Sequence, residues 1–269
     1  MNRGLFRRLK QVFITKRQRF VMSVGFLTLC LFFSEYLLGK SGFFWVIFLS
    51  ILASVLFLLS VYEDLKKNFH PQVFILPFLF TLSFGLFYFL VPGRFLSRGI
   101  LTVLYGVGLY SLYLSQNIFI VASIRTIGLL NGARIVSFVI TLVSYFFLTN
   151  IVFTFRLQII PLAFLVFIFS YLLILQAFWT ITLEKSLVKT SLWVLGLSLC
   201  LLEVAVILWF WPTTPTVIAL FLTGFFYTIV GISQVWFDKR LFRGVIWEYI
   251  WVAVIVFCIL ILFTSWGGQ

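Results

Sequence analysis

The sequence has few charged residues, and acidic residues are the scarcest of them. Of its 269 residues, 10% are charged and 63% are hydrophobic, and seven are Asp or Glu. Soluble domains carry about 25% charged and about 45–50% apolar residues. A water-soluble fold could not bury so much apolar surface, so the excess must face lipid. We therefore expect an integral membrane protein with several spans.

Histidine and cysteine are also scarce, which limits metal and redox chemistry. The one histidine, His70, lies between apolar runs, whereas Cys30, Cys200 and Cys258 lie inside such runs without the spacing of metal ligands. An odd number of cysteines within spans argues against a disulfide framework. We expect no metal site and no cofactor.

Motifs of membrane enzymes are missing as well. The two aspartates, Asp64 and Asp238, are far apart in the sequence, so no aspartate cluster is available for a magnesium diphosphate. The sequence has no H-E-x-x-H motif and no Gly-rich nucleotide loop. His70 lies outside the apolar runs, which argues against an intramembrane Ser–His pair. These absences favour a protein that is not an enzyme. An intramembrane enzyme using Glu35 and Glu203 is the third of three alternatives.

Long apolar runs dominate what is present. Each run is long enough to cross about 30 Å of hydrocarbon as a helix. The runs do not alternate apolar and polar residues as barrel strands do, and a helix satisfies its own backbone hydrogen bonds in lipid. We expect an all-α integral membrane protein, a bundle of about nine transmembrane helices, over residues 20–39, 43–62, 72–91, 99–121, 134–153, 157–179, 190–211, 215–236 and 244–264.

Basic residues predict the orientation of these spans. With the N-terminus in the cytoplasm, sixteen of the twenty Lys and Arg residues lie on the inner side, as the positive-inside rule requires. The net charge of +13 then reflects topology and not nucleic-acid binding. We expect a basic cytoplasmic segment (1–19), a transmembrane domain (20–264) and a short outer tail (265–269). Residues 1–19 form either an interfacial amphipathic helix on anionic inner-leaflet lipids or a disordered tail.

Three acidic residues lie within the predicted spans, and one of them, Glu248, is near the inner end of the last span. Glu203 is the deepest, and Glu35 lies near the outer end of the first span. An ionised carboxylate at such depth costs about 2.5–3.5 kcal/mol on insertion scales. Gly196 and Cys200 share the helical face of Glu203, and small residues mark helix contacts. We expect Glu203 to face the bundle, either in a proton-coupled or substrate-binding role or as a hydrogen-bonded packing residue.

A polar face runs along the fifth predicted span. Steps of three and four residues place its members on one side of a helix. This face either lines a polar cavity or packs through hydrogen bonds between helices. Its members are Ser137, Thr141, Ser144, Tyr145 and Thr149, with Asn150 beside them.

A second polar group connects the fourth and fifth spans at the predicted inner interface. The segment SQNIFIVASIRTIGLLNGAR (115–134) interrupts a mostly apolar sequence. It is a lipid head-group site, a docking surface for a partner protein, or a topological connector whose polar groups bond the loop. Its polar residues are Gln116, Asn117, Arg125, Thr126, Asn131 and Arg134.

Tyrosine followed by glutamine recurs in three of the predicted spans. The glutamines are Gln116, Gln176 and Gln234, separated by 60 and 58 residues. Transporters often contain internal repeats. Two shared residue types per unit are weak support for a true repeat.

The segment around residue 125 resembles the central signature of DUF5656, a family of bacterial multi-pass membrane proteins. That signature runs roughly E-N-I-x-N-V-A-A-x-R-T-I-x-L-L-R-A-A and is followed by an apolar span with threonines. The likeness covers about residues 116–150. Gln116 stands where the family tends to have Glu, and Ile120 where it tends to have Asn. The resemblance implies no activity. The matching residues are Asn117, Ile118, Val121, Ala122, Arg125, Thr126, Ile127, Leu129, Leu130 and Ala133.

Three functions fit these features, in a bacterial cytoplasmic membrane. The first is small-molecule or lipid transport or handling within the bilayer, at Glu203 and the polar face of the fifth span. The second is a non-enzymatic subunit or scaffold of a membrane or envelope complex, with a protein partner at the segment from Arg125 to Arg134. The third is the intramembrane enzyme. The deep acid favours the first.

Overall fold

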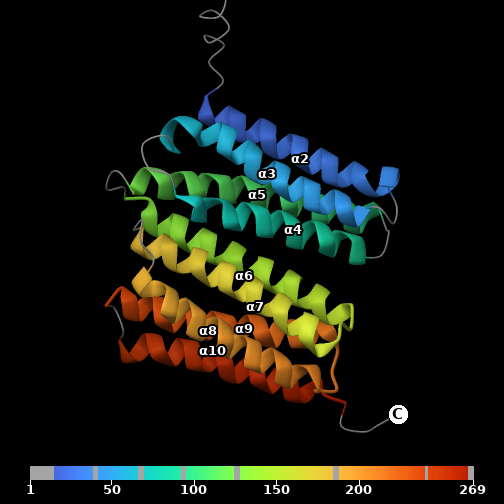
Figure 1. The fold of residues 1–269 in the computed structure, drawn as a ribbon, viewed down its shortest axis with the longest axis vertical. Coiled ribbons are helices and arrows are strands. Elements are labelled where there is room, and N and C mark those ends of the chain that lie inside the picture. Colours follow the sequence, from blue (N-terminus) through green and yellow to red (C-terminus); the bar gives the residue numbers. More distant parts are fainter. Residues whose placement is uncertain are drawn as a thin grey trace, which may run out of the picture.

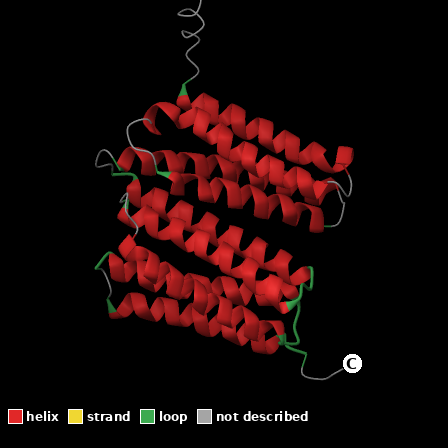
Figure 2. Ribbon diagram, viewed as in Figure 1, coloured by secondary structure: helices red, strands yellow, loops and turns green. Residues whose placement is uncertain are grey.

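The computed structural model describes residues 15–38, 42–65, 70–91, 95–123, 128–183, 188–239 and 242–265. In these ranges the chain forms nine long α-helices, one short 3-10 helix and no strand (Figure 2). The elements are α2 (Lys16–Leu38), α3 (Gly42–Leu65), η2 (Pro71–Phe74), α4 (Ile75–Leu90), α5 (Phe95–Ala122), α6 (Leu130–Thr154), α7 (Ile159–Thr182), α8 (Val188–Trp209), α9 (Pro215–Phe237) and α10 (Arg243–Leu262).

The helices agree with the predicted spans. Each of the nine apolar runs coincides with one long helix, and eight helices in the described part of the chain are long and apolar enough to cross a membrane. The remaining one, α2, begins with the basic residues Lys16, Arg17 and Arg19 before its apolar part. The prediction of a polytopic, all-helical membrane protein is confirmed. Of the predicted basic segment 1–19, residues 1–14 lie outside the described residues, and residues 16–19 form the start of α2.

The helices lie side by side and alternate in direction (Figure 1). Helices α2 to α5 form one side of the bundle, α8 to α10 form the other, and α6 and α7 lie between them. Helices α2, α4, α6, α8 and α10 all begin at the same end of the bundle. We call it the basic end, because Lys16, Arg17, Arg134, Lys239 and Arg243 lie there.

Packing distinguishes central helices from peripheral ones. Helix α6 contacts α4, α5, α7 and α9 and buries half of its side chains, among them Tyr145 and Leu148. In α10, by contrast, Leu260 is the one fully buried side chain. Exposed Phe44, Leu96 and Ile160 show that apolar side chains cover the outside too, as lipid contact requires. The central helices α6 and α7 therefore hold most of the buried polar groups discussed below.

Candidate functional site

Most hydroxyls on the polar face of α6 bond to their own helix. The hydroxyls of Thr141, Ser144 and Thr149 donate to the carbonyl oxygens four residues earlier, at 2.8 Å in each case. All three side chains are buried. Such bonds satisfy a hydroxyl in an apolar interior without a partner helix. These three hydroxyls are therefore satisfied within α6 itself.

Tyr145 and Asn150 link α6 to its neighbours. Ser170 Oγ of α7 donates to the Tyr145 hydroxyl at 3.3 Å, and Asn150 Nδ2 donates to Thr216 Oγ1 of α9 at 3.2 Å. The Tyr145 ring also lies 4.5 Å from the Phe226 ring. These two residues hold three helices together through polar and aromatic contacts.

A groove lies where the polar face of α6 meets α7, α9 and α10 at the basic end. Its volume is about 360 Å³, within the usual range of ligand sites. Ile135 and Val139 are exposed on its α6 side, so the groove opens toward the surrounding lipid. Its polar lining residues are Arg134, Ser137, Thr141, Thr180, Tyr227, Gln234, Asp238 and Tyr249. We call it the α6–α9–α10 groove.

Arg134 is held in place by the end of α7. Its Nε donates to Thr180 O at 3.1 Å and its Nη2 to Ile181 O at 2.9 Å. These are carbonyls of the last helical turn, which lack partners within the helix. The chain then leaves α7 through Leu183 in the left-handed conformation, at φ 50°. The arginine thus caps α7 and complements the negative end of its dipole.

The remaining guanidinium nitrogen of Arg134 faces an acid. Arg134 Nη1 lies 3.9 Å from Asp238 Oδ2, and the two side chains are 25% and 33% exposed. The separation is too long for a hydrogen bond. Asp238 caps the end of α9, which brings it to the same end of the bundle as Arg134. The charged pair therefore forms a loose, accessible mouth of the groove.

Aromatic and amide groups complete the groove wall. The rings of Tyr227 on α9 and Tyr249 on α10 lie 5.0 Å apart, and Glu248 interacts electrostatically with both phenols. Gln234 Nε2 donates to Ala177 O of α7 at 3.3 Å. The amide of Gln234 thus ties α9 to α7 beside the Arg134 contact.

A buried amide pair lies deeper, between α5 and α7. Gln176 Nε2 donates to Gln116 Oε1 at 3.2 Å, and both side chains are fully buried. Trp179, one turn further along α7, packs against His70 at 5.5 Å between ring centroids. His70 is 2% exposed, a burial that its position between apolar runs does not reveal. The recurring glutamines thus meet α7 from α5 and α9, which the sequence pattern alone did not show.

The other described polar residues of the segment 115–134 are less buried than Gln116. Asn117 is half-buried near the end of α5, and Asn131 is exposed in the first turn of α6. Arg125 and Thr126 lie outside the described residues, as does the side chain of Glu35 at the end of α2. Within the described part of the segment, Gln116 and Arg134 make side-chain hydrogen bonds to a neighbouring helix, α7.

Glu203 does not point into the bundle, so that expectation was wrong. The side chain is exposed on α8, and a Cβ added at Gly196 would meet no atom within 4 Å. Helix α8 buries a different face, made of Val194, Ser198, Leu201, Ala205 and Leu208. Glu203 is two residues from both Leu201 and Ala205. Two residues are a rotation of about 200° about the helix axis, so Glu203 lies on nearly the opposite face. The structure therefore separates Glu203 from the polar face of α6.

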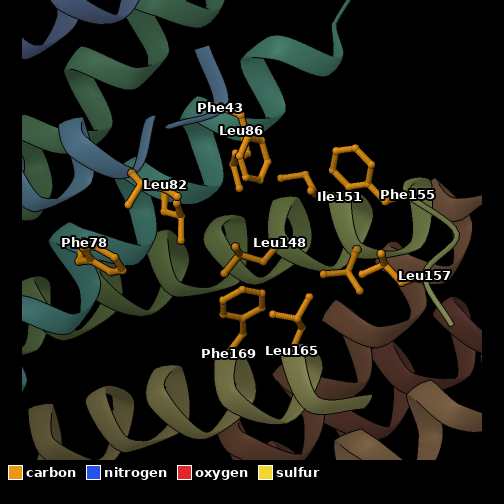
Figure 3. A pocket seen from close by; sticks show the side chains of 12 residues that line it. Phe43, Phe78, Leu82, Leu86, Leu148, Ile151, Phe155, Leu157, Leu165 and Phe169 are labelled. Carbon is orange, nitrogen blue, oxygen red and sulfur yellow. The ribbon is translucent and has the colours of Figure 1, made fainter. Parts of the chain in front are cut away.

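A second, wholly apolar pocket lies between α3, α4, α6 and α7 (Figure 3). Its volume is about 530 Å³. Phe155 and Leu157 line it and flank Arg156, an exposed residue in the turn after α6 with φ 47°. The pocket therefore reaches the end of the bundle opposite the basic end, and it has room for hydrocarbon.

Half of the polar groove lining was not predicted from the sequence. Arg134, Ser137 and Thr141 were candidates, and Gln234 appeared only through the weak repeat, whereas Thr180, Tyr227, Asp238 and Tyr249 were not candidates. These four residues are 46 to 115 positions from Arg134, and nothing local signals that α7, α9 and α10 meet the start of α6.

Comparison with known families extends the likeness seen around residue 125. A family model described as "Protein of unknown function (DUF5656)" matches residues 24–263. The match includes all the helices from α3 to α10 and most of α2. No curated protein and no solved structure matches the chain.

Proposed function

The chain belongs to the DUF5656 family of unknown function, and we propose that it handles lipid by binding a membrane phospholipid in the α6–α9–α10 groove. One observation carries the proposal. The groove has a charged mouth at Arg134 and Asp238, and its α6 side is open between exposed apolar residues. A phospholipid in the bilayer matches this arrangement, because its charged head group would lie at the mouth and its apolar chains along the open side.

Arg134 is the anchor for the phosphate. The α7 carbonyls use its Nε and one N–H of Nη2, which leaves donors on Nη1 for another acceptor. Arginine binds phosphate through such paired N–H groups and stays charged. Because α7 fixes the guanidinium, little side-chain freedom is lost when the lipid binds.

The membrane context follows from charge. We propose that the basic end lies on the cytoplasmic side of a bacterial inner membrane, where the positive-inside rule places Lys and Arg. Lys16, Arg17 and Lys239 would then contact the anionic lipids of the inner leaflet. The apolar pocket of Figure 3 lies toward the opposite leaflet. It is suited to the hydrocarbon chain of a different lipid molecule from the one in the groove.

The experiment is native mass spectrometry of the protein released from lipid nanodiscs. Arg134→Gln should lower phospholipid occupancy about tenfold, because a charge-assisted hydrogen bond contributes about 1.5–3 kcal/mol. Arg134→Lys, which keeps the charge, should retain part of the occupancy. Arg243→Gln is the matched control, since Arg243 is exposed at the same end and does not line the groove.

Equal lipid occupancy in wild type, Arg134→Gln and Arg243→Gln would contradict the proposal. Thermal unfolding of each variant, measured in the same detergent, separates loss of lipid from loss of the α7 cap. If Arg134→Gln loses lipid but unfolds at the same temperature as Arg134→Lys, the loss reflects binding and supports the proposal.

A second candidate function is a subunit of a membrane assembly, and Glu203 favours it. This carboxyl is exposed on the side of α8 that no described helix covers. It lies six residues before Trp209, about 9 Å along the helix axis. A partner helix that hydrogen-bonds the carboxyl would remove the cost of holding it in lipid.

A further inference from the structure

We infer that the lipid in the α6–α9–α10 groove carries a primary ammonium next to its phosphate. This inference rests on the proposed function and adds the class of head group. Phosphatidylethanolamine has such a head. The observation behind it is the spacing and chemistry of the charged pair at the mouth.

Arg134 and Asp238 are close without satisfying each other. Their nearest charged atoms are 3.9 Å apart, and both side chains are partly exposed. A well-made Arg–carboxylate pair has N–O distances of about 2.7–2.9 Å. The N–H donors of Arg134 Nη1 and the acceptor oxygens of Asp238 therefore both remain available at the mouth of the groove. A head group with an anion and a cation in sequence can engage both at once.

The charge balance of the groove favours a head of zero net charge. Arg134 and Asp238 are the two charged residues that line the described groove, so their charges cancel. Lys239 and Arg243 are exposed at the same end but do not line the groove. An anionic head would therefore satisfy Arg134 while repelling Asp238, and like-charge contacts discriminate between ligands.

The acceptors of the groove favour a primary over a quaternary ammonium. A primary ammonium has three N–H donors. At the mouth, the Asp238 carboxylate offers oxygens that accept from these donors. A quaternary ammonium has no N–H, so it would leave the carboxylate without a hydrogen bond. Phosphatidylcholine is therefore the informative competitor.

The test uses the full chain in nanodiscs made of equal parts phosphatidylethanolamine, phosphatidylcholine and phosphatidylglycerol with identical acyl chains. Native mass spectrometry then identifies the lipids that stay bound. We expect wild type to retain phosphatidylethanolamine over each competitor by about tenfold, the factor for one charge-assisted hydrogen bond. Asp238→Asn should reduce this preference to near unity while phospholipid remains bound. Glu203→Gln makes the same chemical change outside the groove and should leave the preference intact.

The outcomes separate the two proposals. If the bound lipid depends on Arg134 but phosphatidylglycerol or phosphatidylcholine is retained as well as phosphatidylethanolamine, the head-group inference is overturned and the lipid function stands. A preference that survives in Asp238→Asn also overturns the inference. If no bound lipid depends on Arg134, both proposals fail.

Discussion

At the residue scale, several polar groups inside the bundle are satisfied by one another or by the end of a helix. Arg134 compensates the open carbonyls of α7. Gln116 and Gln176 satisfy part of each other's amide hydrogen bonding within the core. Glu203 differs from these residues, because it lies exposed in an apolar span. The second candidate function assigns this carboxyl to a contact with a partner helix, which would remove the cost of holding it in lipid.

The prediction at this scale concerns Glu203. Glu203→Leu should release any stable protein partner or second copy, because leucine can neither donate nor accept the hydrogen bond. Glu203→Gln should retain it, since an amide does both. Extraction in mild detergent followed by native mass spectrometry measures the assembly. Wild-type protein that leaves the membrane as a single chain would contradict the assembly function, and Glu203 would then face lipid.

The sequence shows which polar residues are unusual in an apolar span, but it does not show whether their side chains point into the bundle or outward. Arg134 stands out in the sequence because few charged residues surround it. The outward direction of Glu203 depends on which face of α8 packs against α7, and that face is defined by Val194, Leu201 and Ala205. In a helix that is apolar on all sides, hydrophobic periodicity cannot identify the packed face. Gly196 and Cys200 were therefore a misleading guide.

At the scale of elements, the end of α7 is where four segments meet. Gln176 binds α5, Ala177 accepts from α9, Trp179 packs against His70, and Thr180 accepts from α6. Polar contacts between helices matter in lipid, because hydrophobic association is weak there. The helix lengths were predictable because the bilayer sets them. These contacts were not, because they join residues 46 to 109 positions apart.

Close packing of α9 on α10 gives the prediction at this scale. A Cβ added at Gly224 would lie 2.6 Å from Val256 Cγ2 and 3.1 Å from its Cβ. Valine is rigid, so the helices must separate. We expect Gly224→Ala to lower the free energy of unfolding by about 1–3 kcal/mol, as overpacking does. Unfolding by SDS in mixed micelles measures it.

Gly196→Ala is the matched control, because an added Cβ there meets no atom within 4 Å. Both variants gain the same helix propensity, about 1 kcal/mol, so their difference isolates the packing effect. Equal stability of the two variants would show that α10 does not pack on α9 as described.

At the scale of the whole molecule, the nine alternating long helices of the described residues place the start of α2 and the end of α10 at opposite ends of the bundle (Figure 1). The number of long helices was predictable because each coincides with one apolar run, and eight of them are long and apolar enough to cross a membrane. The lateral order of the helices was not, since it depends on contacts such as those of α6 with α9.

The topology prediction follows from this arrangement. In a chain whose Cys30, Cys200 and Cys258 are replaced by alanine, Ser265→Cys should react with a membrane-impermeant maleimide on intact cells. Thr15→Cys should react only after the cells are opened, because the basic end faces the cytoplasm. Labelling of both positions, or of neither, on intact cells would contradict nine spans. Labelling of Thr15→Cys alone would reverse the orientation.

The measurement that tests the central claim most directly is photocrosslinking of a phospholipid with a diazirine beside its head group. The lipid is incorporated into nanodiscs with the protein, and modified peptides are mapped by mass spectrometry. The account predicts crosslinks on the first turns of α6, the last turns of α9 and the first turns of α10, all reduced in Arg134→Gln. Crosslinks spread evenly over the basic ends of all helices, unchanged in Arg134→Gln, would show that the groove binds no lipid.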